Sequence, residues 1–138
     1  MKRKYTIIIL FIIIAAVLTV AIRYDKPYKP TSFVIDGEIF SATVENGDTM
    51  LLDLQNDNKQ TEWSITQTPE CYTSDYSNVT QDVTEFHIIA LDDGEGVMGF
   101  QCVTQSGTVK NYELTLSISR HQKTYFQIDS ASFVEVKD

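Results

Sequence analysis

The sequence predicts an all-β sandwich preceded by a separate apolar segment. Short runs of alternating apolar and polar residues recur about every 8–12 residues, which is typical of sandwich strands. Turn signals rich in Gly, Asn and Asp separate these runs, and no helical period follows residue 22. The chain has 138 residues, which is enough for one such domain and a short appendage.

Residues 1–22 form the separate segment. Lys2, Arg3 and Lys4 are a basic head, and residues 5–22 carry no charge. We expect a retained membrane anchor, because this run is close to the ~17–25 apolar residues that cross a bilayer. The alternative is a signal peptide cleaved after Ala21, which would give a secreted protein. In both cases the basic head stays in the cytoplasm and the remainder is exported.

The exported part is strongly acidic. The whole chain has a net charge of −8, and without the leader, which holds three basic and no acidic residues, the charge is −11. This charge argues against nucleic acid and against an anionic lipid surface as partners. Solubility is the simplest explanation of the charge, and a basic partner is the alternative.

The chain has two cysteines, Cys71 and Cys102. Export to an oxidising compartment favours a disulfide between them. The alternative is two separate buried thiols that behave as small apolar side chains. Neither cysteine has a His in a supporting context, so we do not expect a nucleophile.

The sandwich is expected over residues 32–119. The alternating runs predict strands at 33–36, 39–44, 49–54, 62–67, 83–91, 97–104 and 112–119. Residues 68–82 indicate short edge strands and loops. Three aromatic residues are expected in the core, namely Trp63, Phe86 and Phe100, and for Trp63 a contact with a partner is the alternative.

A tether and a tail flank the sandwich. The tether is residues 23–31, which Pro27 and Pro30 stiffen. The tail is residues 120–138. Its two alternating runs, 124–128 and 132–136, indicate an extra hairpin or edge strands.

Residues 39–119 resemble the chagasin-like inhibitors of papain-type cysteine proteases. In that family a Gly-Glu-type turn leads through an apolar strand to an Asn-Pro-Thr-Thr-Gly loop and then to a strand with a Trp. Here Gly47-Asp48 is the turn, residues 56–61 are the loop and Trp63 follows. Phe86 matches the Phe after the family's second loop, and residues 112–118 match its final strand.

The loops differ from the family in their residues. Residues 56–61 contain no Pro, no Thr-Thr and no Gly, and residues 79–82 contain no Gly. The third loop follows residues 100–103 and has no Arg-Pro-Trp. In such an inhibitor a Gly without a Cβ approaches the protease closely, and a nearby aromatic side chain supplies buried area.

The resemblance implies an immunoglobulin-like sandwich that binds a papain-like cysteine protease through three loops. The alternative is a cell-envelope interaction or structural module without inhibitory activity. The loop residues expected to meet a protein partner are Asn56, Asp57, Asn58, Lys59, Gln60, Thr61, Val79, Thr80, Gln81, Asp82, Gln105, Ser106 and Gly107.

Other candidate sites are weak. The acidic turn at residues 92–96 could hold calcium, but it lacks EF-hand spacing. Asn78 begins a glycosylation sequon whose use we do not expect. His87 and His121 have no neighbouring ligand pair. We therefore expect no enzyme activity, no cofactor and no metal site.

Overall fold

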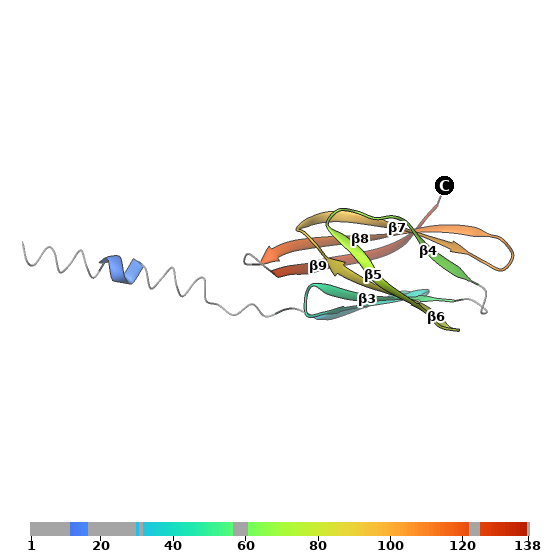
Figure 1. The fold of residues 1–138 in the computed structure, drawn as a ribbon, viewed down its shortest axis with the longest axis horizontal. Coiled ribbons are helices and arrows are strands. Elements are labelled where there is room, and N and C mark those ends of the chain that lie inside the picture. The colour runs from blue at the N-terminus through green and yellow to red at the C-terminus, as the bar shows by residue number, and fades with distance from the viewer. Residues whose placement is uncertain (1–11, 17–29, 31, 57–60, 122–124, 138) are drawn as a thin grey trace, which may run out of the picture.

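The computed structural model describes residues 12–16, 30, 32–56, 61–121 and 125–137. Within them the strands form two antiparallel sheets, so the all-β class is confirmed (Figure 1). One sheet has the order β1-β2-β3-β6-β5 and the other has the order β4-β7-β8-β9. The strands are β1 (Phe33–Asp36), β2 (Phe40–Glu45), β3 (Thr49–Gln55), β4 (Glu62–Gln67), β5 (Tyr72–Val79), β6 (Val83–Ala90), β7 (Gly94–Val103), β8 (Val109–His121) and β9 (Tyr125–Val136).

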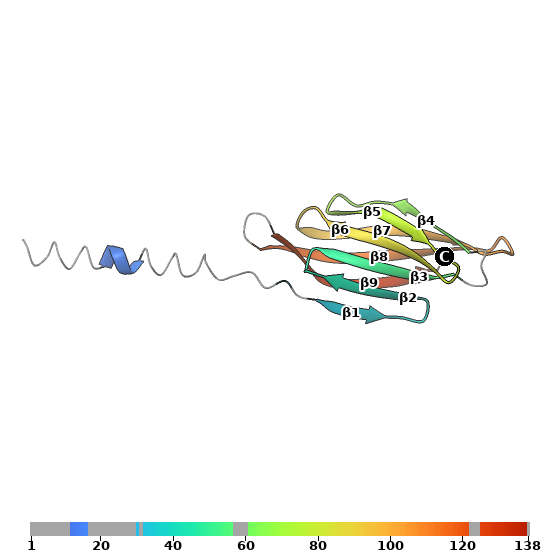
Figure 2. The same ribbon diagram turned by 60° about the horizontal axis from the view of Figure 1, so that its bottom comes forward.

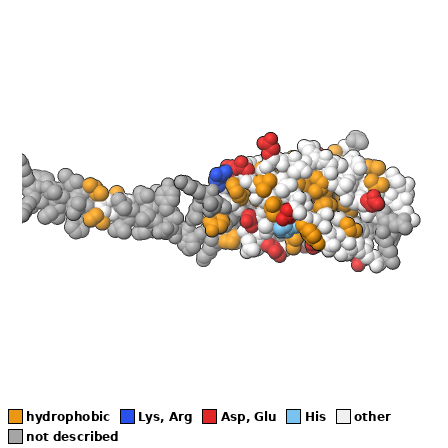
Figure 3. All heavy atoms as spheres, in the orientation of Figure 1, with side chains coloured by type: hydrophobic (Ala, Val, Ile, Leu, Met, Phe, Trp, Pro, Cys, Tyr) orange, Lys and Arg blue, Asp and Glu red, His pale blue; other side chains and the backbone are white. Residues whose placement is uncertain are grey.

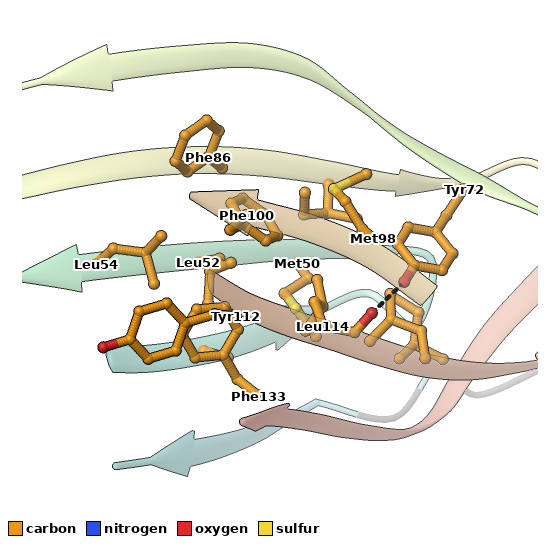
Figure 4. Close-up of a cluster of buried hydrophobic side chains, with 14 of the residues drawn as sticks. Met50, Leu52, Leu54, Tyr72, Phe86, Met98, Phe100, Tyr112, Leu114 and Phe133 are labelled. Carbon is orange, nitrogen blue, oxygen red and sulfur yellow. Dashed lines mark hydrogen bonds between the residues drawn. The ribbon is translucent and has the colours of Figure 1, made fainter. Parts of the chain in front are cut away.

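The core lies between the two sheets. On β3 the apolar residues Met50, Leu52 and Leu54 are fully buried, because alternate residues of a strand point to the same face. Across the sheets the Phe86 ring meets the Phe100 ring edge-on, with 5.2 Å between their centroids. Figure 4 shows these side chains converging between the two layers.

β9 contributes a large side chain to the core between the sheets. Phe133 is buried, and its ring lies 5.3 Å from that of Tyr112, 5.7 Å from that of Phe100 and 5.1 Å from that of Phe40. The two runs expected in the tail are therefore one continuous strand. The register shift opposite Ser117 and Ile118 places a bulge between them.

β5 is also longer than the short strands expected within residues 68–82. It pairs with β6 at the edge of the first sheet, with a bulge at Asp75. Its first residue, Tyr72, is fully buried and reaches across the core to the second sheet. The Tyr72 hydroxyl is shared between the carbonyl oxygens of Gly96 at 3.0 Å and Leu114 at 2.6 Å.

In place of the expected disulfide, the structure has two free buried thiols. The Cys71 sulfur lies so close to the Gly96 backbone that a Cβ at residue 96 would be 2.6 Å from it. Cys102 stands six residues further along the same strand, β7, or about 20 Å away at ~3.3 Å per residue. A bridge needs Cα atoms about 4.4–6.8 Å apart, so the topology separates the two cysteines.

The N-terminal segment is described only in part. Residues 12–16 are helical, and the rest of residues 1–22 lies outside the described residues. Within the described part of the chain, no helix has the length and hydropathy to cross a membrane.

Candidate functional site

The three expected binding loops lie at one end of the sandwich, here named the loop end. They connect β3 to β4, β5 to β6 and β7 to β8. Gln55 at the end of β3 pairs with Val83 at the start of β6. Glu62 at the start of β4 pairs with Val103 at the end of β7. These pairs place the beginnings and ends of all three loops beside one another.

Asn56 ties the first loop to the second. Its backbone N–H donates to the Asp82 carbonyl oxygen at 2.8 Å, and its side-chain amide donates to the Thr80 carbonyl oxygen at 3.0 Å. Its amide oxygen accepts from the buried Thr84 hydroxyl at 2.9 Å. Asn56, expected to contact a partner, is therefore engaged in positioning the two loops.

The C-terminal end of the first loop enters the core. Thr61, expected at a binding surface, is buried. The half-buried Trp63 packs against the Tyr112 ring at 5.2 Å, and its indole N–H donates to the Gln55 carbonyl oxygen at 3.2 Å. The expected contact residues Asp57, Asn58, Lys59 and Gln60 lie outside the described residues.

The third loop is a closed polar turn. The Ser106 hydroxyl lies 3.0 Å from that of Thr104 and 3.1 Å from that of Thr108. Gly107 has a φ of 82°, a conformation that favours glycine, and its N–H donates to the Thr104 carbonyl oxygen. Gln105, Ser106 and Gly107 are exposed, so this loop presents a polar tip held by its own hydrogen bonds.

The second loop is exposed along its length, and Val79 at the end of β5 is an exposed apolar residue before it. Val79 is 70% exposed, and Thr80, Gln81 and Asp82 follow it on the surface. Val109 beside the third loop is also exposed. The loop end thus carries isolated apolar side chains on a mainly polar surface.

A groove of about 380 Å³ opens beside the loops, and we name it the mouth groove. It lies where the two sheets separate, and the Gln55 N–H beside it donates to the Ile39 carbonyl oxygen. Its walls are Glu38, Ile39, Phe40, Lys110, Tyr112, Phe133 and Glu135. The sequence pattern did not predict this groove.

Charged residues occupy inward-facing positions in the mouth groove. In the strand register, Lys110 stands opposite the buried Cys102 and Glu135 stands opposite the buried Tyr112. Directly opposed residues lie on the same face of a sheet, so both charged residues are on the inner face. Burial raises the pKa of the Tyr112 phenol, and the Glu135 carboxylate raises it further. A break in the apolar alternation at residues 110 and 135 was the signal that could have indicated the groove.

The opposite end of the sandwich holds the acidic turn. Arg120 pairs with Asp92 at 2.8 Å and lies 3.7 Å from Asp93, so it balances much of the turn's charge. Hydrogen bonding with Asp93 and with Arg120 lowers the pKa of Asp92. Among the described residues, no group of three His, Cys, Asp or Glu side chains is arranged to hold a metal ion.

The histidines make local contacts. His87 lies on β6, and its Nδ1 is 2.5 Å from the Asp75 carboxylate on the neighbouring strand. His121 Nε2 lies 3.2 Å from the Ser119 hydroxyl. Both contacts are near the surface.

No protein-family model matches the chain, and no curated protein or solved structure matches it either. The geometry of the loop end is therefore the basis for the functional proposal.

Proposed function

We propose that the chain is an exported, membrane-tethered β-sandwich that binds a protein partner through its loop end. The observation that carries this proposal is the gathering of three loops at one end of a rigid double sheet, since binding residues concentrate on loops held by such scaffolds. Asn56 fixes the relative positions of two of the loops. This arrangement suits binding to the surface of another protein without catalysing a reaction.

The direction of the chain supports this use of the loop end. Phe33, the first residue of β1, pairs with Val44 beside the turn between β2 and β3. The chain therefore enters the sandwich at the end opposite the loops (Figure 2). A domain tethered through residues 1–31 would present the loop end away from the membrane.

The strand order supports an immunoglobulin-like assignment. The order β2-β3-β6-β5 opposite β4-β7-β8 corresponds to the A-B-E-D and C-F-G sheets of constant-type immunoglobulin domains. β1 and β9 are additional edge strands in this assignment. Its B–C, D–E and F–G loops are the three loops of the loop end.

The resemblance to chagasin-like inhibitors suggests a papain-like cysteine protease as the partner. Such an inhibitor would insert its three loops into the protease cleft. The alternative is a cell-envelope interaction module, and the chemistry of the third loop favours it. Residues 104–108 form a small polar turn, which offers little of the aromatic area that usually anchors a tight interface.

Titration of papain with purified protein lacking residues 1–23 tests the inhibitory version. Saturable inhibition that is lost when Asn58-Lys59-Gln60 is replaced by Gly and Ser residues would support it. A matched control is Leu91→Ser, which changes an exposed residue far from the loops. Equal activity with and without the protein at high micromolar concentration would remove this target and leave the envelope module.

A further inference from the structure

The floor of the mouth groove is aromatic. Tyr112 and Phe133 are buried and stacked, with an interplanar angle of 3°, and Phe40 packs against Phe133. Figure 4 shows the Tyr112 hydroxyl pointing out of this cluster and away from Leu114. The stack covers one face of each ring, so a cation can be attracted only to a ring face that opens to the groove.

Two carboxylates flank this floor from opposite sheets. Glu38 belongs to the turn between β1 and β2, and Glu135 belongs to β9. Both side chains line the groove and are exposed. In the described part of the chain, no ion pair involves Glu38, Glu135 or Lys110. The carboxylates are therefore available to an incoming group.

The surroundings add negative charge. The strands of the first sheet contain no Lys or Arg. In the described sandwich the basic residues are Lys110 and Lys137 at the loop end and Arg120, which is paired at the opposite end. On the face drawn in Figure 3, the blue group among the coloured residues lies at that opposite end, while acidic and apolar groups extend to the loop end. The groove lining itself holds two carboxylates, Glu38 and Glu135, and one ammonium, Lys110, which leaves one net negative charge that favours a cation.

We propose that the mouth groove binds an arginine side chain of the protein partner. The inference rests on the proposed function, since it names an anchor residue of the partner bound at the loop end. A guanidinium stacks on aromatic rings and donates in its own plane to carboxylates, so one group uses both the floor and the two flanking glutamates. Arginine is also among the residues that most often anchor protein interfaces.

The test is a titration of the full chain in detergent micelles with N-acetyl-arginine methylamide. Trp63 is the only Trp of the chain and contacts Tyr112, so a 5-fluorotryptophan label gives one ¹⁹F signal beside the groove. We expect a saturable shift with a Kd on the order of 1 mM, as for a fragment of this size. The neutral isostere citrulline should shift the signal at least tenfold less.

Variants separate groove binding from general charge attraction. Glu38→Gln with Glu135→Gln should weaken arginine binding at least tenfold, whereas Glu45→Gln, at the opposite end, should leave it unchanged. Lys110→Met should strengthen binding several-fold by removing a competing cation. The lysine analogue, N-acetyl-lysine methylamide, should bind more weakly than the arginine compound.

Three results would overturn the proposal: no saturable shift, an equal response to citrulline, or unchanged binding in the glutamate double variant. Tighter binding of the lysine analogue would replace arginine by lysine as the ligand. The titration contains no protein partner, so its outcome is independent of papain inhibition. A failed inhibition assay with retained arginine binding would reject the protease and keep the groove.

Discussion

At the residue scale, Tyr72 links the two sheets through the core. Its hydroxyl is the polar group that meets the backbone carbonyls of Gly96 and Leu114. Tyr72→Phe should lower the free energy of unfolding by about 1–3 kcal/mol, because two buried carbonyls lose this partner. Tyr76→Phe is the matched control, since Tyr76 is exposed on the same strand. Equal loss in both variants in urea unfolding would contradict the assigned role.

The same phenol gives the protein an alkaline limit. Burial raises the pKa of Tyr72 well above its ordinary value near 10. The unfolded chain then releases this proton first, so the stabilisation is complete below pH 10 and is lost as pH rises toward the pKa of the folded state. The free energy of unfolding should fall by up to ~1.4 kcal/mol per pH unit for each such group.

Urea unfolding at a series of alkaline pH values checks this dependence. Tyr72→Phe should reduce the slope above pH 10 and leave the part that comes from Tyr112, whose pKa is also raised. A slope that is the same in the variant and the unmodified protein would show that other groups cause the alkaline loss.

At the element scale, the pairing of β3 with β6 contains an electrostatic conflict. Asp53 stands directly opposite Glu85 on the outer face of the first sheet, and among the described residues its buried Oδ1 has no hydrogen-bond partner. Glu85→Gln should raise the free energy of unfolding by about 0.2–1 kcal/mol, because opposed like charges destabilise a sheet. The gain should be largest at low salt.

The control for this prediction is Glu113→Gln on β8. Glu113 stands opposite Gly99 and Val134, so it has no opposing carboxylate. Thermal unfolding of both variants at low and high salt separates the local repulsion between Asp53 and Glu85 from the effect of the domain's net charge. Equal gains would attribute the effect to the reduced net charge of the domain.

The contribution of β9 to the core can be tested by substituting two adjacent residues, one buried and one exposed. Phe133 is buried among aromatic rings, and Val134 is 53% exposed. Phe133→Ala should cost about 3–5 kcal/mol of unfolding free energy, as for a large core side chain. Val134→Ala should change it by less than ~0.5 kcal/mol. Similar small changes in urea unfolding would mean that β9 is dispensable to the core.

At the scale of the whole molecule, the sequence predicted most strands but not their partners. Residues 49–54 and 112–119 are clear alternations, and they are β3 and most of β8. The tail was expected to form an extra hairpin or edge strands, and β9 is an edge strand of the second sheet. A run such as 132–136 reveals its period but not the sheet it joins. The bulge in β9 also broke one strand into two apparent runs.

The candidate site likewise has parts that the sequence predicted and parts that it could not predict. Turn residues such as Asn and Gly marked the first and third loops, whereas the second, residues 79–82, has none of them and was placed through the family resemblance. The hydrogen bonds of Asn56 and the mouth groove could not be predicted, because both depend on contacts between segments far apart in the sequence. Long-range packing also decided the state of the cysteines, where compartment alone had favoured a bridge.

The fold therefore makes a definite prediction about its two thiols. Cys71, just before β5, is buried beside Gly96 of β7, and Cys102 is buried further along β7 itself. Burial raises the pKa of the Cys71 thiol, which lowers its reactive thiolate fraction. Both thiols should react slowly with a thiol reagent in the native protein and rapidly after unfolding. A reductant should leave the melting temperature unchanged, whereas loss of a bridge would remove about 2–4 kcal/mol. A native mass lower by two hydrogen atoms would require β5 and β7, which belong to different sheets, to be placed differently from this structure.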